Sequence, residues 1–130
     1  MKRILFLLIL GLFLSGCSAK QEHSAYRVVT GVQVRYTANG STLERTYTKQ
    51  GSMRSILTYL RILDPFGPVQ PEGEFDSSCQ ITLQYSNGPD RVYLQQGLHY
   101  LQQDNGSWER IDPSHASLLY PLLLLLPSDT

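Results

Sequence analysis

The chain is poor in the side chains that carry most enzyme chemistry. It has three histidines and two cysteines among 130 residues. It contains no G-x-S-x-G, H-E-x-x-H or C-x-x-C motif and no glycine-rich phosphate loop. His23 lies in a polar segment, His99 in an expected strand and His115 in the first turn of an expected helix. The sequence therefore predicts a chain that is not an enzyme and that has no metal site and no cofactor.

Charged side chains are also few, and neither sign dominates. They make up 17% of the chain, with eleven basic and eleven acidic residues. Lys2 and Arg3 lie in a segment that we expect to be removed, which leaves nine basic against eleven acidic residues, a formal charge of −2. Nucleic-acid binding depends on a basic patch on one face. The sequence therefore predicts no nucleic-acid partner.

The apolar run at residues 4–14 is too short to span a membrane, because a spanning helix needs roughly 20 apolar residues. It follows the basic pair Lys2-Arg3 and precedes the small residues Ser15-Gly16. A basic start, an apolar middle and a small-residue end form the layout of an export signal. We therefore expect residues 1–16 to be a signal peptide that is cut off.

The segment Leu14-Ser15-Gly16-Cys17 resembles the lipobox of bacterial lipoproteins. The resemblance implies that a diacylglycerol is attached to the Cys17 sulfur, that the chain is cut before Cys17, and that the new amino terminus can be acylated. It implies a protein anchored by lipid to the extracytoplasmic side of the cell membrane, at the cell surface or in the periplasm. A plain secretory signal with an incidental Cys17 is the alternative.

Three parts of the chain follow from this interpretation: the signal peptide 1–16, the lipidated Cys17 with a polar tether up to residue 25, and one small domain at 26–130. The eight residues 18–25 reach at most roughly 28 Å when extended. Cys79 then has no cysteine partner in the chain, and we expect a buried strand residue there. An intermolecular disulfide is the alternative.

Two alternating segments, 27–37 and 42–48, flank Asn39-Gly40 and predict a β-hairpin. The expected register places Tyr36 opposite Leu43 and, on the other face, Arg35 opposite Glu44. Val32 is likewise expected opposite Tyr47. Arg45 falls on the core side, where it either reaches the sheet edge or marks a site.

Asn87-Gly88 predicts a second hairpin, with Leu83 opposite Val92 and Ile81 opposite Leu94. A third strand pair is expected around residues 104–106. Its register is open, because a two-residue turn places Tyr100 opposite Ile111, whereas a three-residue turn with a bulge places Gln102 opposite Trp108.

Two helices are expected. Apolar side chains at helical spacing predict the first over residues 52–63, ended by Asp64-Pro65. Asp112 as N-cap and Pro113 as first helical residue begin the second, which we expect to be kinked or broken at Pro121. The resulting fold class is α+β, with an antiparallel sheet of about five to six strands and two helices packed on one face.

Two surfaces could bind a partner. Aromatic side chains could line a groove formed by Tyr36, Tyr47, Tyr93, Tyr100 and Trp108. Residues 122–126 are all leucine, so this helix either is buried on every side or exposes a docking face, with Leu122, Leu123 and Leu126 as the expected contacts.

The functional prediction is a membrane-anchored lipoprotein whose domain binds an envelope protein, peptide or wall component without catalysis. An envelope hydrolase that acts through Glu72, Glu74 or Glu109 is one alternative, and a purely structural envelope protein is the other. The Tyr- and Thr-rich hairpin and the segment at residues 108–112 are similar to small uncharacterised lipoproteins of anaerobic Gram-positive bacteria. That resemblance implies no activity.

Overall fold

The computed structural model describes residues 28–129. The segments expected to be a signal peptide and a tether, together with Cys17, lie outside the described residues, so the fold does not address the expectations about them. The described part contains six strands and three helices. They are β1 (Val29–Ala38), β2 (Ser41–Tyr47), α2 (Gln50–Leu63), β3 (Ser77–Tyr85), β4 (Arg91–Gln96), β5 (Tyr100–Gln103), β6 (Trp108–Arg110), α3 (Pro113–Ala116) and α4 (Leu119–Leu125).

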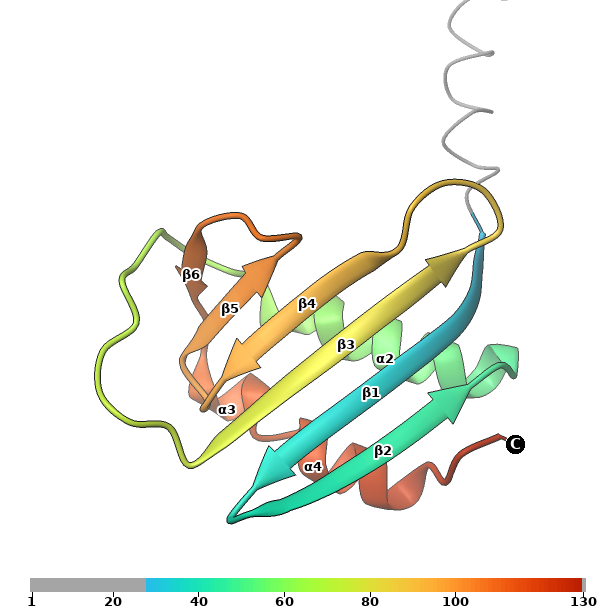
Figure 1. Ribbon diagram of the computed structural model, residues 1–130, viewed down its shortest axis with the longest axis horizontal. Helices are drawn as coiled ribbons and strands as arrows, with labels where there is room; N and C mark the ends of the chain where they lie inside the picture. The colour runs from blue at the N-terminus through green and yellow to red at the C-terminus, as the bar shows by residue number, and fades with distance from the viewer. Residues whose placement is uncertain (1–27, 130) are drawn as a thin grey trace, which may run out of the picture.

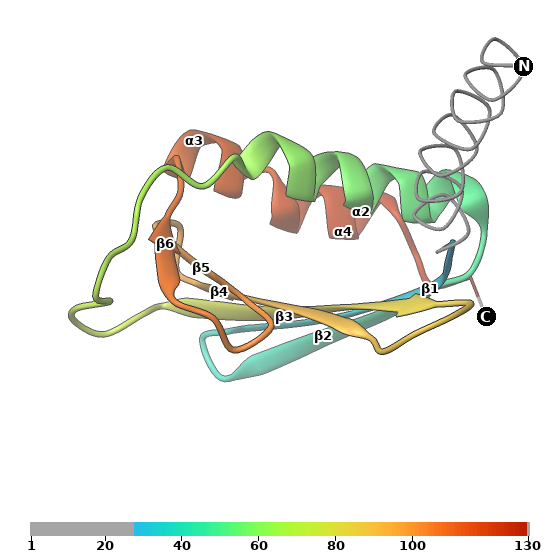
Figure 2. The same ribbon diagram turned by 90° about the horizontal axis from the view of Figure 1, so that it is seen from above.

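The six strands form one antiparallel sheet in the order β2-β1-β3-β4-β5-β6. The helices lie together on one side of it and leave the other face open (Figures 1 and 2). The predicted α+β class with its antiparallel sheet is confirmed. We call the two sides of the sheet the covered face and the open face.

The hairpin of β1 and β2 has the predicted register. Tyr36 pairs with Leu43 and Arg35 pairs with Glu44. Asn39 and Gly40 have φ angles of 53° and 78°. A type I′ turn needs positive φ at both central residues, and asparagine and glycine tolerate it best. Local turn chemistry thus decides this register.

The predicted register of β3 and β4 is wrong by one residue. Leu83 pairs with Arg91 rather than with Val92, and Ile81 pairs with Tyr93. Asn87 is not among the residues with positive φ, so Asn87-Gly88 does not form the type I′ turn. The connection instead runs over residues 86–90. Because side chains alternate between faces, this one-residue shift turns Tyr93 to the covered face and Val92 to the open face.

The strand pair β5 and β6 adopts the longer of the two turns considered, with Gln102 opposite Trp108. Asp104 and Asn105 both have positive φ in this turn. The outer edge of β6 is occupied by residues 66–69 of the loop between α2 and β3. Val69 N–H donates to the Trp108 carbonyl at 2.9 Å, and Arg110 N–H donates to the Gly67 carbonyl at 2.9 Å. An approaching strand therefore meets an edge that is already paired.

Helix α2 begins two residues before the predicted start and ends at the predicted Leu63. Asp64 has a left-handed φ of 41° and precedes Pro65, which cannot continue the helix. One side of α2 enters the core against the covered face. Its buried residues are Met53, Ile56, Tyr59 and Leu63.

The predicted second helix is two helices, α3 and α4, and the break falls before Pro121. Asp112 caps α3, as its side chain accepts a hydrogen bond from Ser114 N–H at 2.9 Å. Pro121 lies in the first turn of α4. Proline has no N–H to donate, and its ring clashes with the carbonyl four residues earlier, so the backbone turns at Ser117 and Leu118 instead.

The last described residues return to β2 and close part of its free edge. Thr46 N–H donates to Ser128 Oγ at 3.1 Å, and Asp129 N–H donates to the Thr46 carbonyl at 2.9 Å. Arg45 reaches the edge, where it donates to the Glu44 carbonyl at 3.1 Å and to the Leu123 carbonyl at 3.4 Å. The contact with Leu123 places a cation at the carboxyl end of α4, where its interaction with the helix dipole is favourable.

Among residues 28–129, no helix is both long enough and apolar enough to cross a bilayer.

Candidate functional site

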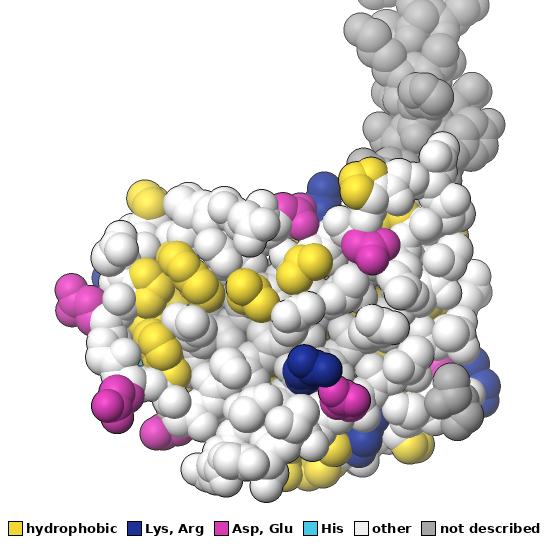
Figure 3. Space-filling view, viewed as in Figure 1, with side chains coloured by type: hydrophobic (Ala, Val, Ile, Leu, Met, Phe, Trp, Pro, Cys, Tyr) yellow, Lys and Arg dark blue, Asp and Glu magenta, His cyan; other side chains and the backbone are white. Residues whose placement is uncertain are grey.

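The open face of the sheet offers a continuous surface of side chains that the helices do not cover. Residues directly opposite one another in an antiparallel sheet point to the same side. One row across the strands therefore runs along this face, and it consists of Glu44, Arg35, Gln80, Leu94, Gln102 and Trp108. In Figure 3 the face is mostly uncharged over β1 to β3, and hydrophobic side chains gather over β4 and β5.

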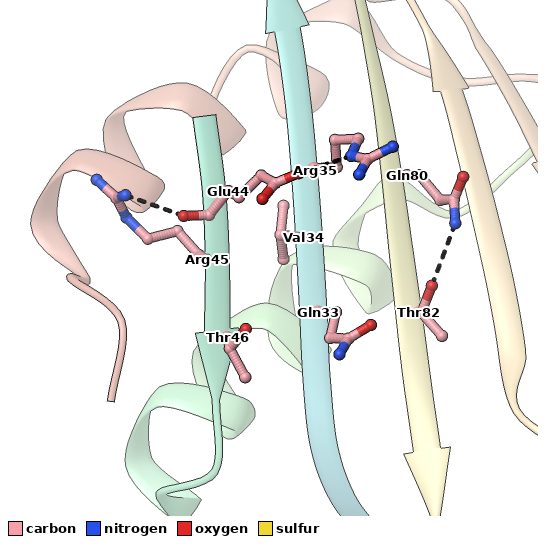
Figure 4. A pocket seen from close by; sticks show the side chains of 8 residues that line it. All are labelled: Gln33, Val34, Arg35, Glu44, Arg45, Thr46, Gln80 and Thr82. Atoms are coloured by element: carbon pink, nitrogen blue, oxygen red, sulfur yellow. Dashed lines mark hydrogen bonds and ion pairs between the residues drawn. The ribbon is translucent and has the colours of Figure 1, made fainter. Parts of the chain in front are cut away.

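The polar half of the open face centres on an ion pair. Arg35 Nε and Glu44 Oε1 are 2.9 Å apart, with 67% and 62% of their side chains exposed. Pairs this exposed stabilise a fold by about 0–1 kcal/mol, so both groups keep most of their capacity to bind another molecule. Gln33, Gln80 and Thr82 add neutral donors and acceptors beside them (Figure 4).

Shallow hollows lie on both sides of Arg35. One has a volume of about 350 Å³ and is lined by Arg35, Glu44 and Thr82 among others. The other, of about 240 Å³, is lined by Arg35, Ser78 and Leu94 among others. Arg35 thus stands between two recesses, and its guanidinium can be approached from either side.

The apolar half of the open face lies over β4, β5 and β6. Val92, Leu94, Tyr100 and Trp108 are all half-buried. Phe75, in the loop before β3, meets Tyr100 edge to face, with ring centroids 5.6 Å apart. Edge-to-face contact is a favoured geometry for aromatic pairs, and aromatic side chains offer a large contact area. The open face therefore combines polar groups at one end with aromatic and aliphatic groups at the other.

The five aromatic residues predicted to line one groove lie on opposite faces of the sheet. Tyr47 is fully buried on the covered face and donates to the Leu126 carbonyl at 2.7 Å. Tyr36 and Tyr93 pack against the same core, and Tyr36 also contacts the Tyr120 ring. Tyr100 and Trp108 belong to the open face. The five residues therefore do not form a common groove. The register shift at Tyr93 places this residue on the face of Tyr36 and Tyr47 and away from Tyr100 and Trp108.

The leucine run divides between the core and the surface. Leu123 is 0% exposed and belongs to the core, so it cannot contact a partner. Leu122 and Leu126 are half-buried and pack against that core. Leu124 and Leu125 are 57% and 78% exposed. The two expectations for this helix, burial and an exposed face, each hold for different residues.

A groove between α2 and α4 was missed by the sequence reasoning. It has a volume of about 510 Å³, and its wall on α4 is formed by Leu118, Pro121, Leu122 and Leu125. These positions follow i, i+3, i+4 and i+7 spacing, a signal that was present in the sequence. It was hidden because every residue from 122 to 126 is leucine, and such a run marks no side as the outer one.

Tyr59 and Gln95 form a buried polar contact between α2 and the covered face. The Tyr59 hydroxyl donates to Gln95 Oε1 and lies 3.3 Å from the Ala116 carbonyl. Gln95 Nε2 donates to the Gly97 carbonyl at 3.1 Å. Burial raises the pKa of the Tyr59 hydroxyl far above its usual value of 10.0, so the group stays protonated and keeps its role as a donor.

Cys79 lies next to this contact, opposite Gln95 in the sheet, and is 4% exposed. Burial raises the pKa of its thiol from 9.0 to about 12. A thiol needs a lowered pKa and access to solvent to act as a nucleophile. The side chain therefore has the properties of a packed apolar residue, which matches the expectation of a buried strand residue.

The carboxylates of the hydrolase alternative lie on two separate parts of the chain. Glu72 and Glu74 lie in the exposed loop between α2 and β3, and Glu109 lies on β6. None of the three lines the hollows beside Arg35 or the groove between α2 and α4. Within the same residues, no group of three or more His, Cys, Asp or Glu side chains could hold a metal ion.

No protein-family model matches the chain, and neither a curated protein nor a solved structure matches it significantly.

Proposed function

We propose that the chain is a lipid-anchored protein of the bacterial cell envelope whose domain binds a protein or peptide on the open face of its sheet, without catalysing a reaction. The anchor is supported by the lipobox-like segment Leu14-Ser15-Gly16-Cys17. The binding role is supported above all by the one-sided cover of the sheet, which leaves a six-strand face open (Figure 2).

The chemistry of the open face suits an extended protein or peptide surface. Arg35, Glu44 and the neighbouring amide and hydroxyl groups can pair with backbone or side-chain polar groups of a partner. Leu94, Tyr100 and Trp108 can bury apolar area beside them. Interfaces of this kind combine an apolar and aromatic centre with polar surroundings.

The size of the face is adequate for a specific complex. The six strands have 10, 7, 9, 6, 4 and 3 residues. With about 4.8 Å between strands and about 3.3 Å per residue, the face covers on the order of 600 Å² in projection, and the relief of its side chains adds accessible surface to this area. A standard interface covers about 800 Å² on each partner. Because the β6 edge and part of the β2 edge are already paired, the face rather than strand addition at an edge is the favoured mode of binding.

The anchor is tested with Cys17→Ser. Without the sulfur that would carry the lipid, we expect the variant to move from the membrane fraction to the soluble or secreted fraction, and to lose incorporation of a labelled fatty acid. Cys79→Ser is the matched control and should leave both readouts unchanged. A Cys17→Ser protein that stayed fully in the membrane fraction would contradict the anchor.

The binding face is tested by placing a photo-crosslinking amino acid at Leu94 on the open face or at Glu72 in the exposed loop. Both labelled proteins are expressed at native levels in intact cells. The probe at Leu94 should give a discrete crosslinked adduct, and Trp108→Ala should weaken this adduct. The probe at Glu72 should give no such adduct. Equal adduct patterns at the two positions, or no adduct at Leu94, would show that the open face is not the binding surface.

A further inference from the structure

The helices α2, α3 and α4, which we call the helix layer, expose an apolar surface that no other part of the described chain covers. In α4, Leu119 and Leu123 face the core. At 100° per residue, the side of α4 opposite them carries Leu118, Pro121 and Leu125, and Leu124 also projects outward. Leu118, Leu124 and Leu125 are 49%, 57% and 78% exposed. A surface helix normally presents polar residues on this side.

The same surface continues across the groove onto α2. Thr58 and Ile62 of α2 line this groove of about 510 Å³ together with Leu125 of α4 and Leu118, the residue before α4. Leu125 rises from the groove rim rather than filling it, as its exposure shows. Leucines that project beside a shallow groove form an uneven surface. Lipid chains can adapt to such a surface more easily than a rigid protein can.

The charged side chains within the helices of the helix layer are all basic. Residues 50–63 include Arg54 and Arg61 and no acidic residue, and residues 113–126 carry no Asp, Glu, Lys or Arg at all. Both arginines are exposed, and Arg54 lines the groove. The whole of residues 28–129 nevertheless has more acidic than basic side chains, and these acidic groups lie in loops, on strands and at helix ends.

The acidic residues nearest the layer do not cancel this pattern. Asp112 and Asp129 accept hydrogen bonds from backbone N–H groups at the starts of α3 and α2. Asp64 lies past the end of α2. The outward side of the layer therefore combines leucines with two arginines, which is the pattern of a surface that enters the headgroup region of an anionic membrane.

We infer that the outward side of α2 and α4 rests on the lipid bilayer, with Leu118, Leu124 and Leu125 below the headgroups and Arg54 and Arg61 at the lipid phosphates. The inference rests on the proposed lipid anchor, because the anchor supplies the membrane next to this surface. It adds a second contact, and it gives the domain an orientation in which the open face of the sheet points away from the membrane.

The length of the chain before the domain permits this orientation. From Cys17 to Val28 the backbone reaches at most about 40 Å, whereas the fourteen residues of α2 extend only about 21 Å. Strand β1 and helix α2 begin at the same end of the molecule (Figure 2). A lipid on Cys17 can thus enter the same membrane surface on which the helix layer lies.

The test uses the full-length chain, purified with its native acylation and reconstituted into phosphatidylethanolamine and phosphatidylglycerol vesicles that contain a doxyl-labelled lipid. An environment-sensitive fluorophore is attached at Leu125→Cys or, as the matched control on the open face, at Thr82→Cys. Cys79 is buried with a raised pKa, and the acylated Cys17 has no free thiol, so the label goes to the introduced position.

We expect the probe at position 125 to be blue-shifted and quenched several-fold more strongly by the doxyl lipid than the probe at position 82. Vesicle-bound protein with equal quenching at the two positions would overturn the inference and leave the anchor intact. A position-125 probe shielded from aqueous iodide but not quenched by lipid would show that another copy of the chain covers the surface, which also overturns the inference. Protein that does not float with vesicles at all would overturn the anchor as well.

Discussion

The carboxylate of Asp129 accepts a hydrogen bond from the backbone N–H of Lys49 at 2.9 Å. It also accepts from Thr48 N–H at 2.8 Å and from Ser52 Oγ at 3.2 Å. Lys49 is the N-cap residue of α2 and provides no side-chain cap of its own. A residue eighty positions later in the chain therefore supplies the acceptor that the start of this helix lacks.

Asp129→Asn should lower the thermal midpoint of unfolding at neutral pH, because the amide offers only one acceptor atom and no charge to the start of α2. The hydrogen bond from Lys49 and those from Thr48 and Ser52 hold the pKa of Asp129 below its usual 3.8. A lowered pKa stabilises the fold above the unfolded value and loses that contribution as the pH falls through the folded value.

The difference in midpoint between parent and Asp129→Asn should therefore be largest above pH 3.8 and should shrink at lower pH. Circular dichroism melts of both proteins across this range provide the measurement. Asp90→Asn, a change in the loop between β3 and β4, is the control and should show no such pattern. A difference that grows as the pH falls would contradict the role of Asp129 as a charged cap.

Tyr59→Phe should destabilise the domain by about 1–3 kcal/mol, because it leaves Gln95 Oε1 buried without its donor. Chemical denaturation gives the free energy of unfolding. In the double variant Tyr59→Phe with Gln95→Met both polar partners are removed, so its cost should be smaller than the sum of the two single changes. Strictly additive costs would show that the two side chains are not coupled.

Leu123→Ala should cost about 2–5 kcal/mol, since it opens a cavity at a residue that is 0% exposed. Leu124→Ala, at the neighbouring position, is the matched control and should stay within about 0.5 kcal/mol, because that side chain is 57% exposed. The two proteins can be compared in urea titrations. Equal costs at positions 123 and 124 would show that α4 is rotated from the arrangement described.

Cys79 should react slowly with a thiol reagent in the folded protein. Its pKa of about 12 leaves on the order of one thiolate in ten thousand at pH 8, and burial adds a barrier to access. In the Cys17→Ser background, where Cys79 is the remaining cysteine, colorimetric labelling should be at least about 100-fold faster in denaturant than in buffer. Comparable rates in the two conditions would show that the thiol reaches solvent.

Local sequence patterns were sufficient to predict the elements whose contacts lie close together in the chain, namely the β1–β2 hairpin and helix α2. Asn39-Gly40 allows the positive φ angles of a type I′ turn, and this turn sets the β1–β2 register and the Arg35–Glu44 pair. Apolar spacing and Asp64-Pro65 were enough to identify α2. In each of these cases the residues that determine the structure are close to one another in the sequence. The local pattern is therefore enough to predict the element.

Asn87-Gly88 shows where this reasoning fails. The dipeptide has the same letters as Asn39-Gly40, but Pro89 follows it directly. Proline has no N–H for the β-ladder, and the hairpin connection opens into a longer loop. The pairing of β3 with both β1 and β4 then selects the register, and Tyr93 changes face. Hence the face on which Tyr93 lies could not be predicted from alternation alone.

The sequence by itself determined the fold class, the first hairpin, the helix α2 and the lipobox-like segment that underlies the proposed anchor, because periodicity and short motifs depend on neighbouring residues. Only the tertiary structure decided which leucines of residues 122–126 are buried, which aromatic residues share a face, and that Asp129 caps α2. These outcomes depend on contacts between residues far apart in the chain. A run of identical leucines, or a single aspartate near the end of the described chain, has no local pattern that could reveal them.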